Sequence, residues 1–133
     1  MAEHGTAQSA HLEKADRFLQ ASNRALRAAD YETAVSRAYY TVFHAIRALV
    51  SGLENVKSHR QVIDRCVQWN NRYTRLNGVA NLFRYKSLQA SLEGLYAWRL
   101  VADYDIEGVD TERAQEAVVY AHRFLARIKE VQR

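Results

Sequence analysis

The sequence contains no proline and only five glycines among its 133 residues. Proline breaks helices, and glycine disfavours their interiors, so the usual interruptions of regular helical structure are scarce here. Alanine, leucine, arginine and glutamine, which favour helix, are frequent throughout the chain. The composition therefore predicts an all-α protein.

The chain also lacks the residue sets of several common sites. Its single cysteine, Cys66, cannot form an internal disulfide, and no two histidines have the spacing that binds a metal on a helix. No glycine-rich loop that could hold phosphates is present. We therefore expect neither a structural zinc ion nor nucleoside triphosphate hydrolysis, and we expect no metal and no cofactor.

Long hydrophobic runs are missing as well. Charged residues interrupt every apolar stretch before it reaches the roughly 20 residues of a membrane-spanning helix. The segment 1–14 lacks the apolar core of a signal peptide. We expect a cytoplasmic protein that does not insert into a membrane.

The charge balance favours an anionic partner weakly. The formal net charge is +4, from nineteen Lys and Arg against fifteen Asp and Glu. Arginine far outnumbers lysine, and guanidinium groups suit bidentate phosphate contacts and stacking on bases. A GC-rich genome would produce the same bias, so the composition alone leaves an RNA partner open.

The composition does not shift along the chain, which predicts one domain over residues 1–133. Apolar residues recur with helical period in five segments. These segments are 6–29, 30–52, 58–73, 79–102 and about 110–130. The expected fold is an up-and-down helical bundle of four long helices plus one shorter helix, the third.

Polar residues at the expected helix ends fit this division. Asp30 can cap the second helix and Asp110 or Thr111 the last one, because their side-chain oxygens accept the free amide hydrogens of the first turn. Ser58 and Gln61 have the spacing of a capping box. Gly52 is a reasonable end for the second helix.

The fourth predicted helix places Arg99 in a mostly apolar line of residues. A buried charge needs a partner, and Asp103 or Asp105 just beyond could supply it. We expect an ion pair that is chiefly structural and that presents Tyr104 at the end of the helix.

The second predicted helix, 30–52, has one face made of apolar residues that would pack on the core. The opposite face carries a different set: Arg37, Tyr40, Thr41, His44, Arg47 and Ser51. Arg37 and His44 are seven residues apart, so two helical turns place them about 10 Å from each other on the same side. One phosphate group could lie between them.

Arg37 and His44 have the residue types that phosphodiester cleavage requires. Histidine can exchange a proton near neutral pH, and arginine can stabilise negative charge on a phosphate. We expect these two as catalytic residues, with Tyr40, Arg47 and Ser51 as substrate contacts. One histidine cannot easily serve as both acid and base, but two copies meeting across a twofold axis would supply a second one. The alternative is a solvated helix face that carries an arginine and a histidine by chance.

A second polar region lies at 70–78, NNRYTRLNG, with Arg84, Tyr85 and Lys86 shortly after it. It alternates basic and aromatic residues, as proteins that bind single-stranded nucleic acid do. An ordinary polar connection between two helices would have a similar composition.

The order YETAVSRAYYTVFHAIRALV, then KSHRQVI, RLVADYD and EAVVYAHRFLARI, resembles the HEPN domain family (higher eukaryotes and prokaryotes nucleotide-binding). The resemblance covers nearly the whole chain. The residues that carry it are Ala34, Ser36, Ala38, Tyr39, Tyr40, Phe43, His44, His59, Arg99, Ala102, Asp103 and Tyr104.

This resemblance implies a helical bundle that forms a homodimer and is often encoded beside a nucleotidyltransferase antitoxin. Many members are metal-independent endoribonucleases, whose arginine and histidine are separated by four to six residues at the dimer cleft. Arg37 and His44 match that motif with six residues between them. The implied reaction cleaves RNA and leaves a 2′,3′-cyclic phosphate.

Two differences from active members leave other functions open. Active members commonly carry a polar residue after the arginine, where this chain has Ala38, and Ile46 replaces a tyrosine of one subgroup. The alternatives are a non-catalytic module that binds a nucleotidyltransferase or a nucleotide, and a purely structural dimerisation protein.

Overall fold

The computed structural model describes residues 2–53, 55–77, 85–105 and 108–132, and the side chains from residue 7 onward. The described residues form helices and connecting loops, which confirms the all-α prediction. The five helices are α1 (Ala2–Arg27), α2 (Tyr31–Leu49), α3 (His59–Tyr73), α4 (Leu88–Tyr104) and α5 (Thr111–Val131).

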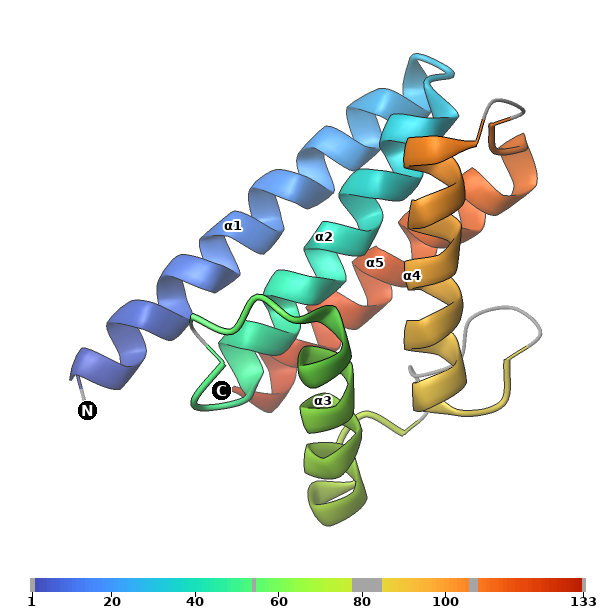
Figure 1. Cartoon of the computed structure of the whole chain (residues 1–133). Helices are drawn as coiled ribbons and strands as arrows, with labels where there is room; N and C mark the ends of the chain where they lie inside the picture. Colours follow the sequence, from blue (N-terminus) through green and yellow to red (C-terminus); the bar gives the residue numbers. More distant parts are fainter. Residues whose placement is uncertain (1, 54, 78–84, 106–107, 133) are drawn as a thin grey trace.

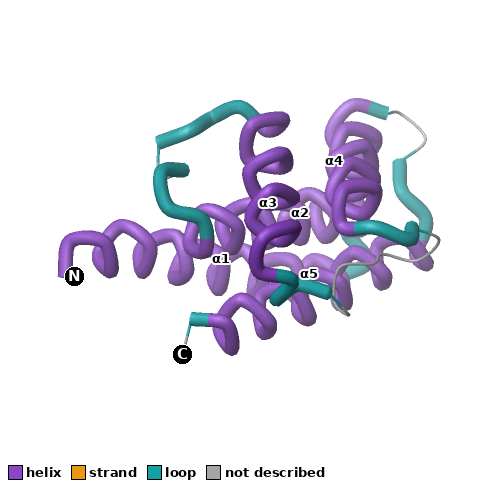
Figure 2. The backbone as a smooth tube through the Cα atoms, turned by 90° about the horizontal axis from the view of Figure 1, so that it is seen from below, coloured by secondary structure: helices purple, strands orange, loops and turns teal. Residues whose placement is uncertain are grey.

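Helix α2 is the centre of the bundle and contacts each of the other four helices. Helices α1 and α2 run antiparallel, side by side, and α5 packs against both (Figure 1). Figure 2 shows α3 and α4 next to each other on one side of these three helices. Helix α2 is therefore covered all round, by α1 on one side and by α3, α4 and α5 on its remaining sides.

The predicted caps are present. Asp30 Oδ1 accepts a hydrogen bond from the Thr33 amide at 3.4 Å, and Asp110 Oδ1 accepts one from the Arg113 amide at 2.8 Å. Ser58 Oγ accepts from the amide of Gln61 at 3.3 Å. These bonds satisfy backbone donors that have no partner within their own helix, so the helix starts are set locally.

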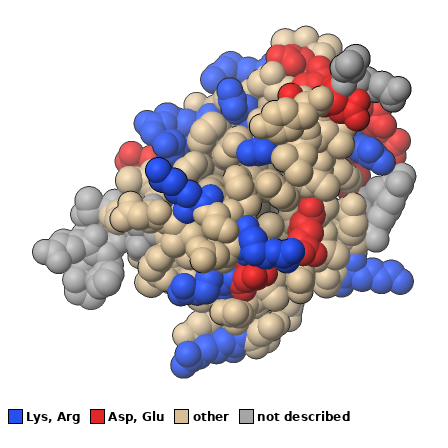
Figure 3. All heavy atoms as spheres, in the orientation of Figure 1, with Lys and Arg blue, Asp and Glu red and all other residues tan. Residues whose placement is uncertain are grey.

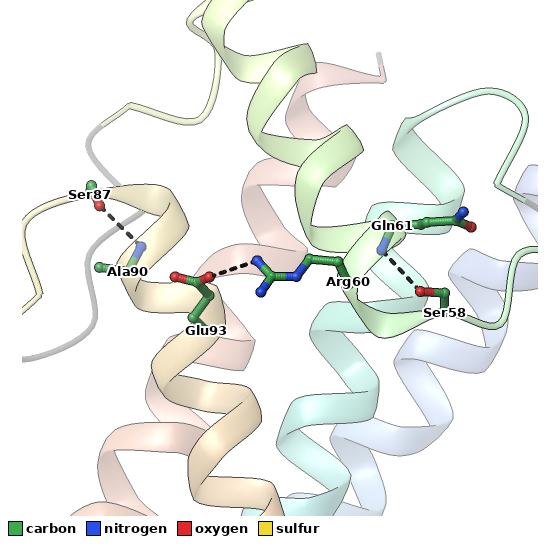
Figure 4. A network of polar contacts seen from close by, with 6 residues as sticks. All are labelled: Ser58, Arg60, Gln61, Ser87, Ala90 and Glu93. Carbon is green, nitrogen blue, oxygen red and sulfur yellow. Dashed lines mark hydrogen bonds and ion pairs between the residues drawn. The ribbon is translucent and has the colours of Figure 1, made fainter.

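Helix α2 ends at Leu49, three residues earlier than predicted, and Gly52 follows with a φ of +89°. Helix α4 begins at Leu88 rather than near residue 79. The Ser87 hydroxyl accepts a hydrogen bond from the Ala90 amide at 3.1 Å and so caps the first turn (Figure 4). Residues 79–84 lie outside the described part of the chain.

The core is formed mainly by α2 and α5. Ten of the large apolar side chains that are fully buried are Val35, Val42, Ile46, Leu53, Val62, Leu76, Leu95, Tyr120, Phe124 and Ile128. Helix α1 contributes small residues, among them Ala15 and Ser22. The Ser22 hydroxyl donates to the carbonyl oxygen of Ala34 at 2.7 Å, and this bond ties the two backbones closely together.

Candidate functional site

The face of α2 that carries Arg37 and His44 lies beneath α1. The His44 ring stacks on Phe18, with ring centroids 5.4 Å apart and planes 6° from parallel. Its Nδ1 lies 3.1 Å from His11 Nδ1, at hydrogen-bond distance. The guanidinium of Arg37 lies 5.8 Å from the centre of the same Phe18 ring. The structure thus brings Arg37 and His44 to one aromatic side chain of α1.

The two residues differ in their access to solvent. His44 is buried, with 6% of its surface exposed, whereas Arg37 is half-buried. Burial, together with the smaller effects of the charges of His11, Arg47 and Lys14, lowers the pKa of His44 to about 3. His44 is therefore neutral at neutral pH, and α1 separates it from solvent in the single chain.

A second histidine, His59, stands at the start of α3 and packs among aromatic rings of α2 and α4. Its Nδ1 lies 2.5 Å from the hydroxyl of Tyr39. Its ring stacks on Tyr96 at 4.9 Å between centroids and lies 4.8 Å from Phe43. Tyr39, Phe43 and Tyr96 therefore hold this imidazole in place.

His59 opens on a surface pocket of about 400 Å³ between α3 and α4, which we call the His59 pocket. Its lining residues are Ser58, His59, Arg60, Ile63, Glu93 and Tyr96. Arg60 and Glu93 face each other across it and form an ion pair at 3.3 Å (Figure 4). Burial lowers the pKa of His59, and the positive charges of Arg99 and Arg47 add to that effect.

Arg99 lies behind the His59 pocket among three tyrosines. Its Nη2 donates to the hydroxyl of Tyr40 at 2.7 Å, and its guanidinium lies 5.4 to 5.6 Å from the ring centres of Tyr39, Tyr40 and Tyr96. Its Nε lies 3.4 Å from Asp103 Oδ2. The ion pair predicted between Arg99 and Asp103 is thus confirmed.

The remaining predicted substrate contacts, Arg47 and Ser51, differ in burial. Arg47 is buried, with its guanidinium 4.6 Å from the ring centre of Phe43, and its Nε makes no hydrogen bond to the described residues. Ser51 is exposed in the turn after α2, where its carbonyl oxygen accepts a hydrogen bond from Arg65. The structure places Arg47 near His59, since both contact Phe43.

The sequence reasoning missed the pairing of His59 with Tyr39, which are twenty residues apart and on different helices. The available signal was the position of His59 at the first turn of a capped helix, beside Ser58. A helical wheel of one segment cannot show such a contact, because it depends on how α2 and α3 are placed.

The described residues contain no cluster of three or more His, Cys, Asp or Glu side chains that could bind a metal ion. None of the described helices is long and apolar enough to cross a membrane. On the face seen in Figure 3, Lys and Arg side chains are spread over much of the surface, while Asp and Glu gather near the upper end, where α4 ends and α5 begins.

Comparison with known proteins agrees with this architecture. The model of the HEPN domain family matches residues 8–131. A protein of Methanocaldococcus jannaschii, named "Putative toxin MJ0142", is 32% identical to this chain over 122 residues, which span 89% of this chain and 76% of the relative. The match extends over all five helices, so this chain belongs to the HEPN domain family.

Proposed function

We propose that this protein is a toxin-type endoribonuclease that cleaves RNA without a metal ion and acts at the His59 pocket. The observation that carries the proposal is a solvent-open histidine backed by two buried arginines, Arg47 and Arg99. Between them, these two guanidinium groups have one carboxylate partner among the described residues, that of Asp103. Such an excess of positive charge favours an anion, and phosphate is the anion that RNA presents.

The proposed reaction is an attack of the ribose 2′-oxygen on the adjacent phosphorus. In the tautomer whose Nδ1–H donates to Tyr39, the Nε2 lone pair of His59 takes the proton of the 2′-hydroxyl. The bond from the 2′-oxygen to phosphorus forms, the bond to the 5′-oxygen breaks, and the leaving oxygen takes a proton from solvent. The products are a 2′,3′-cyclic phosphate and a 5′-hydroxyl.

Burial lowers the pKa of His59, so a larger fraction of its imidazole is unprotonated at a given pH than in a free histidine, and an unprotonated imidazole can act as a general base. The positive charges of Arg47 and Arg99 lower that pKa and would also stabilise negative charge on the phosphorane. The charges of Arg47 and Arg99 thus both favour the unprotonated form of His59 and stabilise the phosphorane.

Arg37 and His44 are the second location for this chemistry, and Tyr40 with Arg47 would then contact the substrate. That location requires α1 to move, because Phe18 and His11 cover His44. Formation of a homodimer could drive such a movement by exchanging contacts of α1 between copies. Substitution of Arg37 and His44 on one side, and of His59 on the other, distinguishes these two locations.

The deciding experiment is cleavage of a fluorescent single-stranded RNA in EDTA, with the product ends identified. We expect His59→Ala to abolish cleavage and His44→Asn to retain it, with His122→Ala as an exposed histidine control. Loss of cleavage in His44→Asn and Arg37→Gln but not in His59→Ala would move the site beneath α1. Light scattering on the same samples reports whether the active species is a dimer.

A second candidate function is a non-catalytic partner of a nucleotidyltransferase antitoxin. The observation that favours it is the burial of His44, which removes the family's predicted histidine from solvent in the single chain. If wild type and all variants are folded and leave RNA intact at high protein concentration, this function becomes the better one. Co-purification with a nucleotidyltransferase encoded beside the gene would then test it directly.

A further inference from the structure

A second surface hollow lies at the other side of α3, where the turn after α2 meets this helix. Its volume is about 370 Å³, and its lining includes Ser51, Arg65, Trp69, Arg72 and Tyr73. We call it the α3 hollow. A volume of this order is enough for about one nucleotide, since small-ligand sites begin near 300 Å³.

The lining residues of α3 repeat with the period of a helix. Arg65, Trp69 and Tyr73 follow one another at intervals of four positions, and Arg72 comes three positions after Trp69, so the four lie on one side of the helix. The adjoining face of α3 is buried through Val62, Ile63, Cys66 and Asn70. The outer face of an amphipathic helix usually carries charged and polar residues alone, whereas the face of α3 at the hollow combines two arginines with two large aromatic residues.

The basic groups of the α3 hollow are available to a ligand. Arg65 is exposed, and its Nη2 donates to the carbonyl oxygen of Ser51 at 3.3 Å. The guanidinium of Arg72 lies 5.3 Å from the ring centre of Tyr73 and forms no ion pair within the described part of the chain. No Asp or Glu lines the hollow among the described residues.

The aromatic groups are available as well. Tyr73 has 46% of its surface exposed, and its ring centroid lies 5.0 Å from that of the half-buried Trp69. An exposed tyrosine beside a tryptophan offers a stacking surface for a planar ring. Together with two guanidinium groups, the hollow presents partners for both parts of a nucleotide, its base and its phosphate.

We infer that the α3 hollow binds single-stranded RNA, with Arg65 and Arg72 on backbone phosphates and a base stacked on Tyr73 and Trp69. A single strand is required because the base faces of a duplex are already stacked on each other. This inference rests on the proposed RNA substrate but not on the cleavage chemistry. The hollow and the His59 pocket are lined by different sides of α3, so they are two separate contact sites.

The test measures binding of a fluorescein-labelled 2′-O-methyl oligouridine of roughly ten nucleotides to the full chain by anisotropy. This probe lacks the free 2′-hydroxyl, so it cannot be cleaved, and failure of the nuclease proposal would not affect the result. We expect Tyr73→Ala to weaken binding about 5- to 140-fold, the range for loss of one stacked base. The slope of log K against log salt should stay nearly unchanged in this variant.

Arg72→Gln and Arg65→Gln should act differently, because each removes one phosphate contact. The salt slope should decrease by about 0.7 for each substitution on a single strand. Arg27→Gln is the matched control, since it removes the same charge from an exposed position at the end of α1 far from α3 (Figure 1). Circular dichroism confirms that each exposed-site variant is folded.

Three results would contradict the inference. The first is equal weakening by Arg72→Gln, Arg65→Gln and Arg27→Gln with no effect of Tyr73→Ala, which would indicate attraction by net charge alone. The second is no binding of the probe by wild type at low salt. A duplex RNA that binds as tightly as the single strand would contradict the role given to base stacking.

Discussion

Protonation of His44 should make this protein less stable as the pH falls, and the structure gives the size of the effect. In the unfolded chain its pKa is 6.5, whereas in the folded chain burial under α1 lowers it to about 3. Below pH 6.5 the unfolded chain therefore binds a proton that the folded chain does not. The stability contributed by neutral His44 is complete above that pH and is lost progressively between about 6.5 and 3.

These two pKa values predict a loss of about 2 kcal/mol in the free energy of unfolding between pH 7 and pH 5 from His44 alone. The perturbation that isolates it is His44→Asn. The asparagine amide can occupy a position near that of Nδ1, close to His11, and it does not titrate. Wild type should lose about 2 kcal/mol more than this variant over the same pH interval.

The assay is urea unfolding followed by tryptophan fluorescence at pH 7 and at pH 5. Burial also lowers the pKa of His59, but this residue is present in both proteins, so its contribution cancels in the comparison. His122→Asn is the control, because His122 is exposed, and it should lose as much stability as wild type.

Equal losses in wild type and His44→Asn would refute the reasoning. That result would mean that folded His44 accepts a proton as easily as the unfolded chain does, and hence that α1 does not hold it away from solvent. The catalytic hypothesis for Arg37 and His44 would then gain support over that for His59.

Two further predictions concern the core. Phe124→Ala should lower the free energy of unfolding by about 3 to 5 kcal/mol, because Phe124 is fully buried beside Tyr120 and its loss leaves a cavity. Val119→Ala, on the exposed side of α5, should lower it by less than about 1 kcal/mol in the same urea titration. Cys66 is fully buried, and burial raises the pKa of its thiol to about 12. A thiol reagent should therefore label it only after the protein unfolds. Labelling at a rate that does not depend on the urea concentration would contradict its position in the core.

The helix starts at Asp30, Ser58 and Asp110 were predictable because each is set by residues within one turn. A side-chain oxygen that accepts an amide hydrogen three residues later needs no distant partner. The ion pair of Arg99 with Asp103 was predictable for the same reason, since the two lie one turn apart on α4.

The start of α4 was predicted too early because apolar periodicity continues ahead of it. The helix starts only after Ser87, because the Ser87 hydroxyl accepts a hydrogen bond from the Ala90 amide and so caps the first turn. Serine is common both at caps and on exposed helical positions, so the periodic pattern alone could not distinguish these two roles.

Local periodicity, capping residues and residue order were enough to predict the five helices, most of their ends, the family and the grouping of Arg37 with His44 on α2. The packing of the helices could not be predicted in this way, and it is this packing that covers His44 with α1 and opens His59 on a pocket beside Tyr39 and Tyr96. A helical wheel gives the direction of a side chain but not the element that packs against it. Burial, and with it the pKa and access of each histidine, arises from the placement of helices that are distant in sequence.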